Sequence, residues 1–151
     1  MSLEQTINAD IKTAMLAKDA NVLTSLRAIK AALLLAKTAQ GAKEELTEEE
    51  EIKLVQKLVK QRKDSLEIFE QQNRPDLAEK EKAEIAVIEK YLPAQLGIDE
   101  LKQALQQIIS QLGASSPADM GKVMGAASKA LGGKADGKTI SAVVKELLAS
   151  Q

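Results

Sequence analysis

The sequence predicts an all-α protein with an N-terminal helical domain that contains a long helical hairpin, residues 1–95, and a small three-helix C-terminal domain, residues 96–151. Helix-forming Ala, Leu, Lys, Glu and Gln dominate the 151 residues, which include one Tyr, one Phe and no Trp. Apolar residues recur three or four positions apart, the period of an amphipathic helix. Six of the eight glycines lie from Gly113 onward, so helix-breaking residues are concentrated in the C-terminal part of the chain.

The first two helices are expected over residues 3–15 and 20–40. Ser2 and Gln5 have the spacing of a capping box at the start of the first helix. Asp19 is placed to cap the second. The residues expected on their apolar faces are Leu3, Ile7, Ile11 and Met15 in the first helix and Val22, Leu26, Ile29 and Leu33 in the second.

The long hairpin is expected over residues 48–69 and 75–92. Pro75 suits the first helical position, which places a tight turn directly before it. Pro93 cannot continue a helix and therefore ends the second arm. The apolar faces of the two arms comprise Val55, Val59, Leu66 and Phe69 in the first and Leu77, Ile85, Ile88 and Leu92 in the second.

An acidic run opens the first arm of the hairpin. Thr47 is the expected N-cap, with Glu50 as its capping-box partner, and residues 48–51 are all glutamates. Acids in a first helical turn stabilise the positive end of the helix and increase solubility. A docking surface for a basic partner is the alternative interpretation.

Arg62 lies on the apolar stripe of the first arm. An arginine there is typical of an ion pair at the edge of the core, whereas a ligand site is the less common alternative. Glu81 and Glu84 of the second arm are the two candidate partners.

Three short helices are expected in the C-terminal domain, over residues 100–112, 117–131 and 137–148. Their expected N-terminal caps are Asp99, a Ser116–Asp119 box with Pro117 at its first helical position, and Asp136. Their apolar faces comprise Leu101, Leu105, Ile108 and Leu112, then Met120, Val123, Met124, Ala127 and Leu131, and finally Ile140, Val143, Val144, Leu147 and Leu148.

The chain contains no cysteine and no histidine. Disulfides, thiolate metal sites, and Ser-His-Asp, Cys-His and H-E-x-x-H chemistry are therefore excluded. We expect no catalytic residue, no metal and no cofactor. An enzyme that uses only carboxylates and lysines is the remaining catalytic alternative, and no pair of carboxylates in the sequence suggests a cleft for it.

The sequence predicts a cytoplasmic protein that does not enter a membrane. The N-terminal stretch MSLEQTINADIKTAM has an early acid and lacks the apolar core of a signal peptide. No apolar run approaches the roughly 18 residues that a membrane span needs. The lack of cysteine suits a reducing compartment.

Residues 132–139, GGKADGKT, match the P-loop pattern G-x-x-x-x-G-K-[ST]. A functional P-loop leaves a buried parallel strand and enters a helix, while an acid on another strand holds magnesium. Here a helix precedes the motif, and one terminal helix follows it. We therefore predict that no nucleoside triphosphate binds there.

The same segment keeps the features of an anion site at the start of a helix. The first N–H groups of such a helix favour an anion, and glycines let a partner approach the backbone closely. Residues 113–151 also hold five lysines against three acids. An ordinary glycine cap followed by an N-cap, with solvated lysines, is the alternative, and the spacing leaves both open. The residues that could contact a phosphate backbone are Gly132, Gly133, Lys134, Gly137 and Lys138, with Lys122 and Lys129 seven apart on one face of the preceding helix.

Several stretches resemble the YqeY proteins of the GatB/YqeY family. They are KQRKDS at residues 60–65, YLP at 91–93, DMGKVM at 119–124 and ADGK at 135–138. The resemblance covers essentially the whole chain. It implies a helical N-terminal domain, a cytoplasmic bacterial setting, and a C-terminal part similar to the tail domain of the GatB component of the tRNA-dependent amidotransferase, a tail that binds the tRNA body. RNA contacts are thereby implied at Lys122, Gly125, Lys134, Gly137 and Lys138.

The function expected from these observations is that of a non-catalytic accessory protein in tRNA-dependent amidation. Its C-terminal domain would bind the backbone of structured RNA, with the outer corner of tRNA as the target. The alternatives are a protein–protein adaptor that joins the amidotransferase or an aminoacyl-tRNA synthetase through residues 47–92, and a family-level carbon–nitrogen ligase with glutamine as amido-N-donor that acts only within a larger complex. The candidate RNA-binding residues are Lys122, Gly125, Lys129, Gly132, Gly133, Lys134, Gly137 and Lys138.

Overall fold

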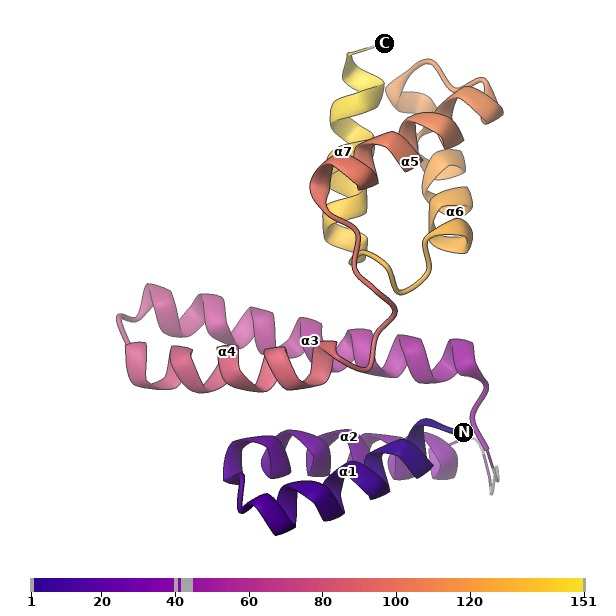
Figure 1. Cartoon of the computed structure of the whole chain (residues 1–151). Coiled ribbons are helices and arrows are strands. Elements are labelled where there is room, and N and C mark those ends of the chain that lie inside the picture. Colours follow the sequence, from indigo (N-terminus) through magenta and orange to yellow (C-terminus); the bar gives the residue numbers. More distant parts are fainter. Residues whose placement is uncertain (1, 40, 42–44, 151) are drawn as a thin grey trace. The chain divides into compact units, whose positions relative to one another are not determined.

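Helices are the regular elements of the structure (Figure 1). The computed structural model describes residues 2–39, 41 and 45–150. They form seven α-helices and one 3₁₀ turn, and among them the only β-type contact is an isolated bridge between Ala39 and Gly41. The all-α prediction is confirmed. None of the helices in these ranges is both long enough and apolar enough to cross a membrane.

Backbone contacts divide the chain into two compact units, Met1–Leu92 and Pro93–Gln151. They are called the first unit and the second unit below. That each one is an independently folding domain, with the boundary expected after residue 95, stays a prediction.

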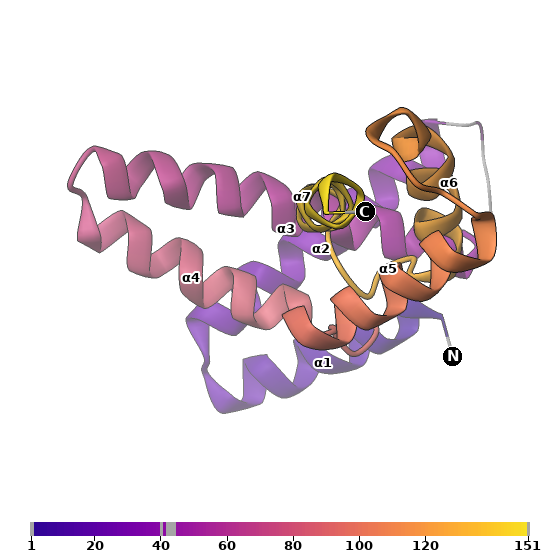
Figure 2. The ribbon, with the colours of Figure 1, turned by 90° about the horizontal axis from the view of Figure 1, so that it is seen from above.

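The first unit consists of two antiparallel helix pairs that stack on each other (Figures 1 and 2). Helix α1, Leu3–Ala17, packs against α2, Ala20–Ala39, and α3, Glu48–Gln71, packs along α4, Pro75–Glu89. Helix α2 contacts both arms of the α3–α4 hairpin. The fully buried side chains at the centre of this core are Ile7, Leu26, Ile29, Leu33, Val55 and Ile88.

Local capping determines where these helices begin. The capping boxes of Ser2 with Gln5 and of Thr47 with Glu50 are both formed, as predicted. Asp19 Oδ1 accepts the Val22 N–H at 3.2 Å, which also agrees with the prediction. Each cap satisfies backbone donors that have no partner within their own helix.

Met15 does not lie in the core, which is contrary to the prediction. Its side chain is 55% exposed, and Ala14 is buried in its place. Each four-residue step overshoots one helical turn by about 40°, so residue 15 lies about 80° around the helix axis from the buried Ile7, whereas residue 14 lies within about 20° of it.

The acidic run at the start of α3 serves helix ends within the first unit. Glu50 completes the cap of α3, and Glu49 pairs with Lys53 at 3.1 Å. The Glu51 carboxylate accepts the Leu3 N–H of α1 at 2.9 Å, so it also satisfies a donor at the start of a second helix. These contacts agree with the interpretation of the run as a helix-end stabiliser.

Arg62 pairs with Glu84, one of its two candidate partners. Arg62 Nε lies 3.1 Å from Glu84 Oε2, and the two side chains are only 18% and 10% exposed. The neighbouring Glu81 keeps one carboxylate oxygen buried without a hydrogen-bond partner among the described residues. Burial, and secondarily the charge of Glu84, raise the pKa of Glu81.

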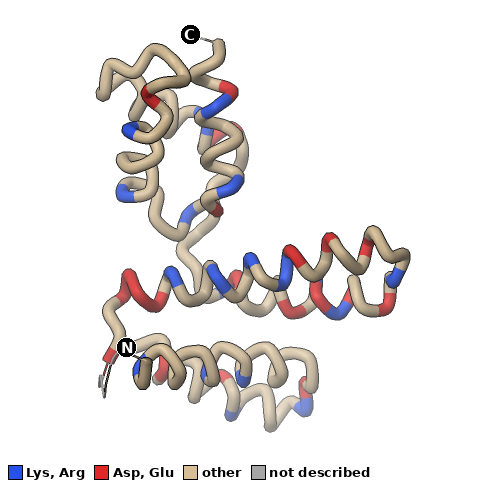
Figure 3. The backbone as a smooth tube through the Cα atoms, turned by 180° about the vertical axis from the view of Figure 1, so that it is seen from behind, with Lys and Arg blue, Asp and Glu red and all other residues tan. Residues whose placement is uncertain are grey.

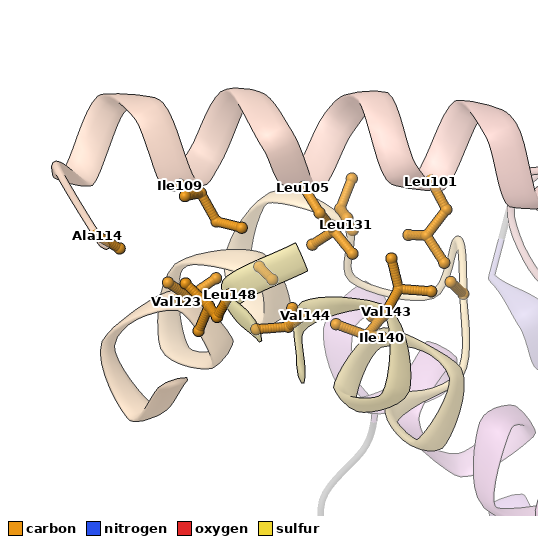
Figure 4. Close-up of a cluster of buried hydrophobic side chains, with 12 residues drawn as sticks. Leu101, Leu105, Ile109, Ala114, Val123, Leu131, Ile140, Val143, Val144 and Leu148 are labelled. Atoms are coloured by element: carbon orange, nitrogen blue, oxygen red, sulfur yellow. The ribbon is translucent and has the colours of Figure 1, made fainter. Parts of the chain in front are cut away.

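The second unit is a three-helix arrangement around its own apolar core (Figure 4). It comprises α5, Ile98–Leu112, the 3₁₀ turn η1, Pro117–Asp119, α6, Met120–Ala130, and α7, Gly137–Ala149. Each α-helix contacts the other two. The side chains that fill the centre are Leu101, Leu105, Ile109, Val123, Ala127, Ile140, Val144 and Leu148.

Two of the three predicted caps in the second unit are formed. Ser116 and Asp119 make the capping box at Pro117, and Asp136 caps α7. Asp99 does not cap α5, because Gly97 occupies the N-cap position and Asp99 is already inside the first turn. A carboxylate in that turn still interacts favourably with the positive end of the helix.

Candidate nucleic-acid interface

Three of the candidate residues share the exposed face of α6. Lys122, Gly125 and Lys129 lie within about 60° of one another around the helix axis. All three are exposed, whereas Val123 and Ala127 point the other way and are buried in the core of the second unit. The packing of α6 therefore presents this face to solvent.

The remaining candidates lie in residues 132–138, which comprise the end of the turn after α6 and the first two residues of α7 and which we call the basic turn. Lys134 and Lys138 are exposed, and Ala135 is buried and anchors the turn to the core. Asp136 Oδ1 accepts the Thr139 N–H at 2.7 Å, and the Asp136 carbonyl accepts the Ile140 N–H. The N–H groups of Gly137 and Lys138, at the first two helical positions, have no acceptor within α7.

The four candidate glycines fall into two classes. Gly133 is buried, and its φ of 80° lies in the left-handed region that favours glycine. A Cβ on Gly132 would approach the Ser128 carbonyl oxygen to 3.2 Å. By contrast, a Cβ on Gly125 or on Gly137 would meet no described atom within 4 Å. The fold therefore accounts for glycine at positions 132 and 133, whereas it does not require glycine at positions 125 and 137.

The acids near this surface are engaged within the second unit. Asp119 accepts the Ser115 N–H at 3.0 Å and the Ser116 N–H at 3.3 Å, and these bonds lower the pKa of Asp119. Asp136 caps α7, and Glu146 lies 3.7 Å from Lys102. Their carboxylates are thereby used in helix capping and in a distant ion pair.

The lysines of the surface are not engaged in the same way. The Lys122 ammonium lies 3.5 Å from the Leu112 carbonyl oxygen. Among the described residues, Lys129, Lys134 and Lys138 make no ion pair or side-chain hydrogen bond. Figure 3 shows lysines along one side of α6 and at the turn that follows it. Their positive charge is therefore available to an external anion.

Two residues of this region were not predicted from the sequence. Gly121 lies one turn before Gly125 on the same exposed face of α6, and a Cβ there would meet no described atom within 4 Å. The four-residue spacing of these glycines could have indicated it. Gln95 hydrogen-bonds to the basic turn from a distant part of the sequence, and no local pattern indicates that contact.

Comparison with known proteins identifies the family. Residues 4–148 match the family model described as Yqey-like protein. The chain belongs to this family. The match confirms the resemblance to YqeY proteins that the sequence indicated, and it covers almost the whole chain.

Curated relatives of this YqeY-like chain are fungal proteins named "Altered inheritance of mitochondria protein 41, mitochondrial". The chain is 36% identical to that of Clavispora lusitaniae over 117 residues, 76% of this chain and 66% of the relative. It is 30% identical to that of Pyrenophora tritici-repentis over 149 residues, 96% and 80% of the two chains. For Lachancea thermotolerans the identity is 36% over 115 residues, 74% and 60%. The chain thus spans slightly less than two thirds of the first of these relatives.

The names of these relatives state a mitochondrial location and no ligand, reaction or partner. They do not support the bacterial cytoplasm expected from the sequence.

Proposed function

We propose that this YqeY-like protein is a non-catalytic accessory factor in tRNA-dependent amidation. Its second unit would bind the sugar-phosphate backbone of structured RNA, with the outer corner of tRNA as the target. One observation carries the proposal: within the described part of the chain, Lys129, Lys134 and Lys138 have no partner, while the acids around them are engaged.

The chemistry of the surface suits phosphate groups better than bases. Lysines supply point charges, and the free N–H groups at the start of α7 supply two further donors. Gly125 and Gly137 leave the backbone accessible without any internal need for glycine. With about four phosphates engaged, we expect a Kd near the non-specific range of roughly 10⁻⁴–10⁻⁶ M, and an affinity that falls steeply with salt.

Stacking on single-stranded bases is not favoured. The two aromatic side chains, Phe69 and Tyr91, both belong to the first unit. The Tyr91 hydroxyl donates to Asp10 at 2.5 Å, and burial together with this bond raises the pKa of Tyr91. Because both aromatic rings belong to the other unit, the second unit has no aromatic platform of its own for bases.

The proposal is compatible with two compartments. The relatives' names make a mitochondrial location a candidate for this chain, alongside the cytoplasmic location expected from its composition. Both compartments contain tRNA, so the proposed binding does not depend on the choice between them.

Backbone amide shifts of the ¹⁵N-labelled full chain test the proposal directly. Unfractionated tRNA is added first at low and then at physiological salt. We expect the amides of residues 132–138 and of Lys122 to move, and salt to reverse the change. If these amides stay in place at low salt, the RNA proposal fails.

An adaptor role through residues 47–92 is the second candidate. Ile68, near the tip of the α3–α4 hairpin, is 50% exposed and lies within this segment, so it offers an apolar contact to a protein partner. Amide shifts confined to residues 47–92 when an amidotransferase or a synthetase is added would favour this role.

Replacing Gly125 by alanine is expected to raise stability and weaken RNA binding at once. Glycine within a helix costs about 0.5–1 kcal/mol relative to alanine, and the new methyl group meets no described atom of the protein. A closely approaching RNA backbone would meet that methyl group. Thermal unfolding and tRNA titration measure the two effects. A variant that gains stability and keeps its tRNA affinity would show that Gly125 is not part of the interface.

A further inference from the structure

The segment that leads into α5 is hydrogen-bonded to the basic turn. Gln95 Nε2 donates to the carbonyl oxygen of Gly133 at 2.6 Å and to that of Pro93 at 2.8 Å. The backbone N–H of the next residue, Leu96, donates to the carbonyl oxygen of Lys134 at 2.9 Å. Two successive carbonyl groups of the basic turn are therefore held from the same short segment.

These bonds restrain the backbone on both sides of Lys134. Gly133 adopts a φ of 80°, and its carbonyl oxygen accepts the hydrogen bond from the Gln95 side chain. The Lys134 N–H itself donates to the Leu131 carbonyl at 2.9 Å. With its N–H and both adjoining carbonyls bonded, Lys134 has little backbone freedom, while its side chain extends from an exposed position.

We propose that Gln95 is a positioning residue for the phosphate-binding turn. It holds the backbone of Gly133 and Lys134 in the conformation that meets RNA, so that the turn is ordered before RNA arrives. This inference rests on the proposed function, because it assigns Gln95 to the same RNA site. A segment that is ordered in advance loses less conformational entropy on binding, which strengthens binding without any contact between Gln95 and RNA.

The side-chain amide is suited to this task by its two donors. One nitrogen carries two N–H groups, and both are used, on the Gly133 and Pro93 carbonyls. Glutamate has nearly the same shape, but when ionised it only accepts, and it places negative charge beside two carbonyl oxygens. Methionine has a similar length and removes the donors without adding charge. The two replacements separate the loss of donors from a charge effect.

The test compares Gln95→Glu and Gln95→Met with the wild-type full chain. Without RNA, we expect both variants to shift the amides of residues 132–138 and to speed hydrogen exchange at Lys134, with Tm changed by a few degrees at most. With tRNA at low salt, we expect Kd to rise about threefold to tenfold in both variants. Gln106→Glu adds the same charge at an exposed position of α5 and is expected to change neither readout.

The outcomes separate this inference from the proposed function. Unchanged turn amides in both variants would overturn the positioning role of Gln95, whatever the tRNA affinity of the wild type. Shifted amides with an unchanged Kd would overturn it as well. If the amides shift and the wild type does not bind tRNA, Gln95 orders the turn and the RNA function is what fails.

Discussion

Replacing Lys134 and Lys138 together by glutamate is expected to abolish the retention of tRNA by the protein. Both side chains are exposed, and neither has a partner among the described residues, so the exchange removes two phosphate contacts and adds repulsion. We expect Kd at low salt to rise more than about tenfold, and the slope of log affinity against log salt to fall by about two. Titration of labelled tRNA over a series of salt concentrations measures both quantities.

The melting temperature of this double variant is expected to stay within a few degrees of the wild-type value, because neither lysine side chain bonds to another described residue. The matched control is Lys57→Glu with Lys60→Glu on α3, which changes the net charge by the same amount on an exposed face of the first unit. If both double variants weaken tRNA binding equally, the effect is one of total charge and the basic turn is not the site. Unchanged tRNA binding in the Lys134 and Lys138 variant would contradict the proposal that the basic turn binds RNA.

Replacing Arg62 by methionine is expected to destabilise the first unit by about 3 kcal/mol. Removing one member of a buried ion pair leaves its partner charged and unpaired in a poorly solvated place. Here Glu84 would remain at 10% side-chain exposure, beside Glu81, one of whose oxygens lacks a partner among the described residues. Urea unfolding followed by tyrosine fluorescence reports on this unit alone, because Tyr91 is the only tyrosine in the chain.

Adding Glu84→Gln to the Arg62→Met chain provides the control. The double variant removes the stranded charge and is expected to recover part of the lost stability. A loss below about 1 kcal/mol in the single variant would show that solvent compensates the pair, as it does for surface ion pairs.

Glu81→Gln at the same cluster is expected to flatten the pH dependence of stability. Because the folded protein raises the pKa of Glu81, the native state holds this proton more tightly than the unfolded chain does. The resulting stabilisation is present below the unfolded pKa and is lost as pH rises through the folded pKa. The glutamine variant should therefore gain on the wild type between acidic and neutral pH. A constant difference across that range would contradict the raised pKa.

The predicted helix starts show how much local sequence can determine. Ser2, Thr47, Ser116 and Asp136 each bind an amide three residues ahead, so four consecutive residues contain all the information needed. The cap expected at Asp99 was wrong because the helix begins earlier, directly after Gly97. Both residues are compatible with a helix start, and the choice depends on the path of the chain before it.

The residues of the candidate interface could also be predicted from the sequence, but only in part. The spacing of lysines and glycines along the sequence places them on α6 and in the basic turn. Whether each one serves the fold or is available to a ligand depends on the residues packed around it. Only the three-dimensional arrangement separates Gly133, which the fold itself requires, from Gly125, which it does not. Only there do the acids prove to be engaged, and Lys134 to be unpaired within the described ranges.

By itself the sequence determined the helical class, the places where most helices begin, and the location of the basic turn, because each of these depends on residues within about one helical turn of one another. The tertiary structure alone decided which partners meet. Of the two partners that the sequence offered Arg62, Glu84 is the one that pairs with it, across 22 residues; Glu51 reaches Leu3 across 48 and Gln95 holds Gly133 across 38, and neither contact was predicted. Such pairs depend on how helices pack, and packing is set by the shape of whole faces, which no short stretch of sequence contains.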